Sequence, residues 1–115
     1  MSNRIVHFDI GCRDKQATGA FYSGVFGWEI GPGANEFALA IEGAGLHGQI
    51  VALGHEPHNY VMVYVEVENI EAAVAAAEAE GGGKVIGPVP LGGGRRFAWL
   101  RDPEATLVGV IDRNG

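Results

Sequence analysis

The sequence has 115 residues, 47% of them hydrophobic and 19% charged, which is typical of one globular domain and not of a disordered chain. The net charge of −6 argues against a nucleic-acid-binding protein, which needs a basic face. A single cysteine, Cys12, excludes an internal disulfide framework. The sequence has no apolar run long enough to span a membrane and no apolar stretch of a secretion signal, so we expect a cytoplasmic protein.

The first predicted strand covers residues 5–11, where side chains alternate between two faces. His7 and Asp9 share one face, and the other face is apolar. One face is therefore suited to packing, and the other to a polar site.

A helix is predicted from Asp14, which can cap its start, to about Val25, with Gly27 ending it. Its apolar residues recur at helical spacing, and we expect this stripe to face the core. The stripe consists of Ala17, Ala20, Phe21, Gly24 and Val25. Shorter strands follow at residues 28–30, 36–41 and 46–53.

The second half repeats this order. Residues 60–67 are the clearest strand, with valines on one face, predicted to lie under the next helix, and Tyr60, Met62, Tyr64 and Glu66 on the other. The helix begins after Asn69, ends at the glycines 81–83 and has one stripe for burial, made of Ile70, Ala73, Val74 and Ala77. Strand-like runs return at residues 85–89, 95–100 and 106–112.

The two halves superimpose at a constant spacing, which pairs Asp14 with Asn69 and Gly27 with Gly82. The same shift pairs His7 with Met62 and Asp9 with Tyr64. We therefore predict one α+β domain over residues 1–115, with a first βαβββ repeat at about 4–53 and a second at about 60–112. The two repeats are expected to complete one cupped mixed sheet whose less apolar face lines a ligand pocket.

The segment Ala20-Phe21-Tyr22-Ser23-Gly24-Val25-Phe26-Gly27-Trp28 and the late turn Asp102-Pro103-Glu104 carry a resemblance to a known family. With them, nearly the whole chain resembles the vicinal oxygen chelate superfamily, which includes glyoxalase I, extradiol dioxygenases, and fosfomycin and bleomycin resistance proteins. The resemblance implies the glyoxalase/bleomycin resistance/dihydroxybiphenyl dioxygenase-like fold. It also implies that single-module chains pair, and we expect a homodimer with the first strands and the aromatic faces near the contact.

The family usually holds a divalent metal with ligands from the first and last strands of each repeat. Matched by position, these ligands fall on His7, Gln49, Met62 and Gly109, with His47 on the face of Gln49. A thioether is a poor ligand for such metals, and glycine has no side chain. At most two of the four ligands remain, and two rarely hold a catalytic ion. We therefore expect no metal and no other cofactor.

These considerations favour a metal-free protein that binds a small, mostly apolar or aromatic molecule in the cup. One alternative is a glyoxalase- or dioxygenase-type enzyme that uses a metal through His7, and another is a structural or regulatory dimer without a ligand. No nucleic acid and no membrane is expected as a partner. The candidate pocket residues are His7, Asp9, His47, Gln49, Met62, Tyr64, Phe97 and Trp99.

Three further groups have both a functional and a structural interpretation. Asp9 and Glu66 are interpreted either as an acid–base pair or as carboxylates that contact solvent. The histidines at 47, 55 and 58 do not have the spacing of a helical zinc motif, so a solvated loop is expected. The run Gly92-Gly93-Gly94-Arg95-Arg96 has the groups to hold an anion, but we favour a flexible hairpin with exposed arginines.

Overall fold

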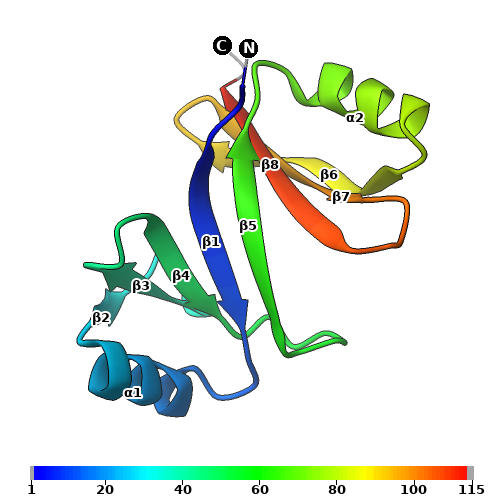
Figure 1. The fold of residues 1–115 in the computed structure, drawn as a ribbon. Coiled ribbons are helices and arrows are strands. Elements are labelled where there is room, and N and C mark those ends of the chain that lie inside the picture. Colours follow the sequence, from blue (N-terminus) through cyan, green and yellow to red (C-terminus); the bar gives the residue numbers. More distant parts are fainter. Residues whose placement is uncertain (1, 114–115) are drawn as a thin grey trace. The chain divides into compact units, whose positions relative to one another are not determined.

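The computed structural model describes residues 2–113, and they form two compact units (Figure 1). The first unit holds residues 7–62. The second unit holds the residues up to Val6 together with those from Val63 onwards. Each unit is described separately below.

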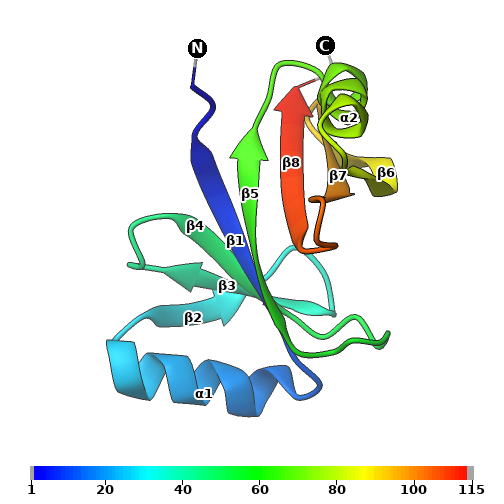
Figure 2. The ribbon, with the colours of Figure 1, turned by 45° about the vertical axis from the view of Figure 1, so that its right-hand side comes forward.

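The first unit is a four-stranded mixed sheet with one helix. Its elements are β1 (Ile5–Gly11), α1 (Lys15–Phe26), β2 (Glu29–Pro32), β3 (Ala38–Glu42) and β4 (His47–Val51), where Ile5 and Val6 of β1 belong to the second unit. Strand β3 runs antiparallel to β2 and β4, and β4 runs parallel to β1, in the order β2-β3-β4-β1. Helix α1 lies along this sheet (Figure 2). The parallel pairing places His7 beside His47 and Asp9 beside Gln49.

The second unit repeats this connectivity. Its elements are β5 (Tyr60–Glu66), α2 (Ile70–Ala79), β6 (Gly83–Gly92), β7 (Arg95–Arg101) and β8 (Leu107–Arg113), where the first residues of β5 belong to the first unit. Strand β7 runs antiparallel to β6 and β8, and β8 runs parallel to β5 with Tyr64 beside Gly109. The predicted α+β class and the two βαβββ repeats are confirmed.

Both predicted helix starts are confirmed by their capping bonds. The side chain of Asp14 accepts a hydrogen bond from the backbone N–H of Ala17 at 3.0 Å, and that of Asn69 accepts one from Ala72 at 2.8 Å. Gly27 ends α1 with φ 73°, a left-handed conformation that glycine adopts without steric cost. These local signals fix where each repeat turns from strand to helix.

The predicted inner face of α1 is wrong. All five residues of the expected stripe are exposed, and Phe21 and Val25 keep 58% and 57% of their surface. The helix instead turns Gly19 towards the sheet, where an added Cβ would lie 3.1 Å from Ile30 Cγ2. Tyr22 stacks on Trp28 with centroids 5.7 Å apart. Close approach through glycine and ring stacking therefore determine the face that α1 buries.

The second unit has its own core beneath α2. Ile70 is fully buried and clusters with Ala98, Leu100 and Val110 from the strands. Val74 and Ala77 pack against this cluster, which confirms the predicted stripe of α2. Such burial contributes about 25 cal/mol per Å² of apolar surface.

The predicted valine face of β5 is only partly correct. Val67, just beyond the strand, packs against the cluster below α2, but Val61 is 70% exposed and Val63 is also exposed. Met62 and Tyr64 on the opposite face are buried. The face with the larger side chains is thus the covered one, because rings and thioethers bury more apolar area than valines.

No helix among residues 2–113 combines the length and the apolar character needed to cross a lipid bilayer.

Candidate functional site

A hydrogen-bonded chain of three side chains is the most chemically distinctive feature of the first unit. Nε2 of His7 lies 2.7 Å from Oδ1 of Asp9, and Nδ1 of His7 lies 2.7 Å from Nδ1 of His47. A carboxylate only accepts hydrogen bonds, so Nε2 of His7 carries a proton. In the neutral ring, Nδ1 of His7 then accepts the bond that His47 donates.

The strands explain why these groups meet. His7 and Asp9 are two residues apart on β1 and so share a face, and the parallel register brings His47 and Gln49 beside them on β4. Nε2 of Gln49 donates to Asp9 Oδ1 at 3.4 Å. His7 and Asp9 are buried, Gln49 is half-buried, and His47 is exposed. The chain therefore leads from the buried carboxylate of Asp9 through His7 to the exposed imidazole of His47.

Tyr60 covers the end of β1 in the same unit. An added Cβ at Gly11 would lie 2.2 Å from Cε1 of the Tyr60 ring, so only glycine permits this contact. Burial, together with the nearby Asp9 and Cys12, raises the pKa of Tyr60 from 10.0 to about 12. The phenol therefore stays protonated at neutral pH.

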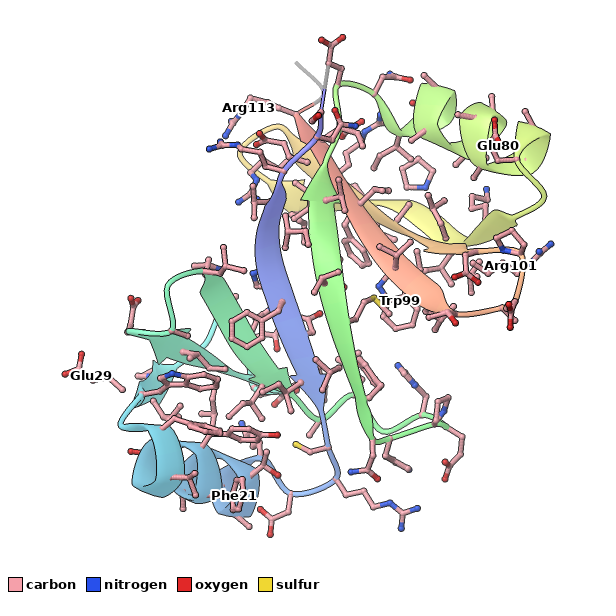
Figure 3. The ribbon with its side chains drawn as sticks, viewed as in Figure 1. Phe21, Glu29, Glu80, Trp99, Arg101 and Arg113 are labelled. Carbon is pink, nitrogen blue, oxygen red and sulfur yellow. The ribbon has the colours of Figure 1, made fainter. Side chains whose placement is uncertain are left out.

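In the second unit, aromatic side chains gather over Gly109. The ring of Tyr64 lies where a Cβ at Gly109 would be, with its Cδ2 atom only 2.3 Å away. Nε1 of Trp99 donates to the Tyr64 hydroxyl at 2.8 Å, and Phe97 meets the Tyr64 ring edge-on with centroids 6.3 Å apart. Trp99 is labelled in Figure 3 on β7. Tyr64 is buried while Phe97 and Trp99 are half-buried, which leaves a partly exposed aromatic surface.

The four positions that the family uses for metal do not form a suitable ligand set. Both ring nitrogens of His7 are already bonded to protein groups, and Gln49 donates to Asp9. Met62 presents a buried thioether, and Gly109 presents backbone beneath a ring. Within residues 2–113, no three histidine, cysteine, aspartate or glutamate side chains come together as potential metal ligands.

Other predicted candidates have structural partners. His58 contacts Glu56 at 3.3 Å in the loop before β5, and His55 is exposed in the same loop. Cys12 is buried and directs its thiol to the carbonyl of Val51 at 3.7 Å. Glu66 is exposed, which agrees with solvent contact, one of its two interpretations from the sequence.

The expectation of exposed arginines after the glycine turn holds for Arg95 but is wrong for Arg96. Arg96 forms a bidentate pair with Glu71 at 2.9 and 2.8 Å. It also donates to the buried carboxylate of Asp112 at 3.1 and 2.6 Å. Sequence reasoning missed this network because its members are far apart in the chain.

Each unit also has a surface hollow. The hollow of the first unit measures about 320 Å³ and is lined by Ile10, Gly11, Cys12, Ala17, Thr18, Phe21, Tyr22 and Asn59. The hollow of the second unit measures about 190 Å³ and lies between the end of α2 and the turn after β7. The candidate residues named from the sequence line neither hollow.

Three solved structures are similar to this chain over nearly its whole length. A hypothetical protein from Bacillus halodurans has TM-score 0.71 and 15% identity, covering 100% of this chain and 97% of that one. A glyoxalase/bleomycin resistance protein/dioxygenase superfamily member from Vibrio splendidus has TM-score 0.67 and 15% identity, with coverage of 96% and 98%. A methylmalonyl-CoA epimerase variant from Streptomyces coelicolor, in complex with 2-nitronate-propionyl-CoA, has TM-score 0.67 and 16% identity, with both chains fully covered. At these identities the likeness shows the fold alone.

A search among curated proteins finds no match to this sequence. The model of the glyoxalase-like domain, in contrast, matches residues 5–111, which include every strand and helix described above except the last two residues of β8. The chain therefore belongs to the glyoxalase-like domain family of the vicinal oxygen chelate superfamily.

Proposed function

We propose that this protein is a metal-free member of its family that binds a small, mostly apolar or aromatic molecule. The main support for the proposal is that the four positions at which the family binds metal do not provide a suitable set of metal ligands in this chain. His7 uses both ring nitrogens within the protein, and the Tyr64 ring occupies the space over Gly109. The half-buried rings of Phe97 and Trp99 supply apolar surface of the kind that flat organic molecules contact.

The metal part of the proposal is tested by calorimetric titration of the purified protein with Ni²⁺, Mn²⁺, Zn²⁺ and Fe²⁺, after treatment with a chelator. We expect no tight stoichiometric binding, because two partly engaged ligands compete poorly with water. One equivalent bound per chain, and lost in His7→Ala but kept in His55→Ala, would refute this part.

The ligand part is tested by fluorescence in a Trp28→Phe variant, in which Trp99 is the remaining tryptophan. Anilinonaphthalene sulfonate serves as an aromatic probe. We expect its binding to quench Trp99, and Phe97→Ala to weaken it on the order of tenfold, equivalent to ~1.4 kcal/mol. Phe37→Ala, which truncates an exposed phenylalanine of the first unit, is the matched control. Equal effects of the two truncations would place binding elsewhere and contradict the proposal.

A second candidate function is metal-free proton transfer, and the chain from Asp9 through His7 to His47 favours it. Nε2 of His47 would take a proton from carbon, leaving the electron pair on the substrate as an enolate. The Nδ1 proton of His47 would pass to His7, whose cation is stabilised by Asp9. A structural neighbour is a methylmalonyl-CoA epimerase, which suggests an acyl thioester as the trial substrate.

The test is deuterium incorporation into methylmalonyl-CoA in heavy water with a chelator present, followed by mass spectrometry. We expect exchange that His47→Gln abolishes and that the loop variant His55→Gln preserves. Absence of exchange in the unmodified protein would remove this candidate and leave the binding proposal standing.

A further inference from the structure

Two arginines border one end of the aromatic surface in the second unit. Strands β7 and β8 pair without a register shift, and Arg95 lies directly opposite Arg113. Side chains alternate along a strand, so Arg95 shares its face of β7 with Phe97 and Trp99. Residues directly opposite in an antiparallel pair share a face of the sheet, so Arg113 lies on this face as well. The two guanidinium groups therefore adjoin the surface that the proposed ligand contacts.

This pair differs from the pair next to it on the opposite face of the sheet. There, Arg96 and Asp112 are also directly opposite, and their charges compensate each other. Among residues 2–113, neither Arg95 nor Arg113 forms an ion pair with a carboxylate. Both are exposed, and Arg113 donates from Nη1 to the carbonyl of Gly93 at 3.1 Å. The pair thus presents two positive charges to solvent.

The electrostatics of this pair favour a bound anion. Like charges directly opposite each other on two strands are destabilising, and an anion between Arg95 and Arg113 offsets their repulsion. A guanidinium has five N–H donors in a planar fork that matches a carboxylate, and the single bond to Gly93 leaves most of them for a ligand. With a net charge of −6, the chain does not favour a polyanion such as nucleic acid, so a small acid is the better fit.

The spacing along β7 links the charge to the rings. Arg95 and Phe97 are two residues apart, which corresponds to about 7 Å along a strand. A flat ring that lies on Phe97 and carries a short acidic substituent can therefore reach the arginines. We propose that the ligand is an aromatic carboxylate, with its ring on Phe97 and Trp99 and its carboxylate between Arg95 and Arg113. This inference rests on the proposed function and adds the chemical class of the ligand.

The test compares 2-naphthoate with 2-naphthamide, a neutral molecule of nearly the same shape, by equilibrium dialysis against the purified chain. We expect 2-naphthoate to bind at least tenfold more tightly, because its charge adds charge-assisted hydrogen bonds. Raising the salt concentration from about 0.05 to about 0.5 M should weaken the binding of 2-naphthoate severalfold and leave that of 2-naphthamide unchanged. This comparison needs no substitution, so it does not depend on the folding of a variant.

Matched arginine variants locate the charge that the probe senses. We expect Arg95→Gln combined with Arg113→Gln to remove the preference for 2-naphthoate while 2-naphthamide binds as before. Arg101→Gln is the control, because Arg101 lies at the other end of β7, where its guanidinium packs over Gly83. Figure 3 labels Arg101 and Arg113, which lie far apart on this sheet. Circular dichroism checks that the variants fold.

The outcomes separate this inference from the proposed function. Equal binding of both probes, weakened by Phe97→Ala, would overturn the carboxylate and leave the apolar binding surface standing. A preference for 2-naphthoate that survives the double substitution, or that Arg101→Gln removes equally, would also overturn the assignment to Arg95 and Arg113. Binding of neither probe would overturn both proposals.

Discussion

Gly109 and Gly48 show how single residues fix the contacts between parallel strands. In the second unit, Tyr64 lies over Gly109, and in the first unit the ring of Phe8 lies 2.5 Å from where a Cβ at Gly48 would be. In both cases ring and glycine are strand neighbours, in the pairs β5–β8 and β1–β4. A missing side chain thus makes room for an aromatic one, which covers the backbone and adds apolar burial.

This contact predicts that Gly109→Ala is destabilising. The added methyl group overlaps the Tyr64 ring, and overpacking of this kind lowers the free energy of unfolding by about 1–3 kcal/mol. Urea unfolding measures the effect. Gly31→Ala is the control, because an added Cβ at this strand glycine meets nothing within 4 Å. Equal stability of the two variants would contradict the packing at Gly109.

At the scale of the elements, Asp112 joins α2 to the sheet of its unit. Its carboxylate, almost fully buried at the end of β8, accepts a bond from the backbone N–H of Ile70 at 2.7 Å, which gives the start of α2 a second cap beside Asn69. Arg96 from β7 bridges this carboxylate to Glu71. Removing one partner leaves a buried charge uncompensated, so the three residues act as one group.

The network predicts a loss of stability in acid. Hydrogen bonds from Arg96 lower the pKa of Glu71 from 4.5 to about 2 and also lower the pKa of Asp112. These carboxylates bind fewer protons in the folded state, so their contribution is complete above the unfolded pKa and is lost as the pH falls towards about 2. Urea unfolding between pH 4.5 and about pH 2 measures this decrease in the free energy of unfolding.

The matched variants for this prediction lie on the same helix. We expect Glu71→Gln to flatten the decrease in unfolding free energy between pH 4.5 and about 2, because the shifted group is gone. Glu78→Gln, an exposed glutamate of α2, should keep the decrease. The prediction fails if both variants follow the parent protein.

At the scale of the whole molecule, the sequence repeats and the compact units do not have the same boundaries. Residues up to Val6 belong to the second unit, where the carbonyl of Arg4 accepts a bond from the N–H of Glu66 at 2.8 Å. Residues 60–62 belong in turn to the first unit, where Tyr60 covers Gly11. Each unit is therefore completed by a piece of strand from the other half of the sequence.

This exchange predicts that separate halves fold poorly alone. Fragments 1–57 and 58–115 each lack a part of one unit, so we expect weak and non-cooperative circular dichroism from either fragment. Mixing them should restore the signal of the intact chain, and the chain cleaved at the same bond serves as the reference. Cooperative unfolding of one isolated fragment with its full helical content would disprove this dependence.

Much of the fold and part of the site followed from local sequence. Asp14, Asn69 and Gly27 mark helix ends through bonds within a few residues, and two-residue periodicity placed His7 and Asp9 on one face. Signals of this kind depend on neighbours along the chain, so the sequence contains them in full.

The tertiary structure alone decided which face of α1 is buried and which side chains share a hydrogen bond. Close packing at Gly19 and stacking on Trp28 turn the side of α1 that carries Tyr22 towards the sheet. The face that carries Phe21 stays exposed, although hydrophobic periodicity predicts that this face is buried. Likewise, Nδ1 of His7 on β1 is hydrogen-bonded to His47 on β4. Both outcomes depend on close contacts between residues distant in the chain, and periodicity carries no information about how closely two surfaces fit.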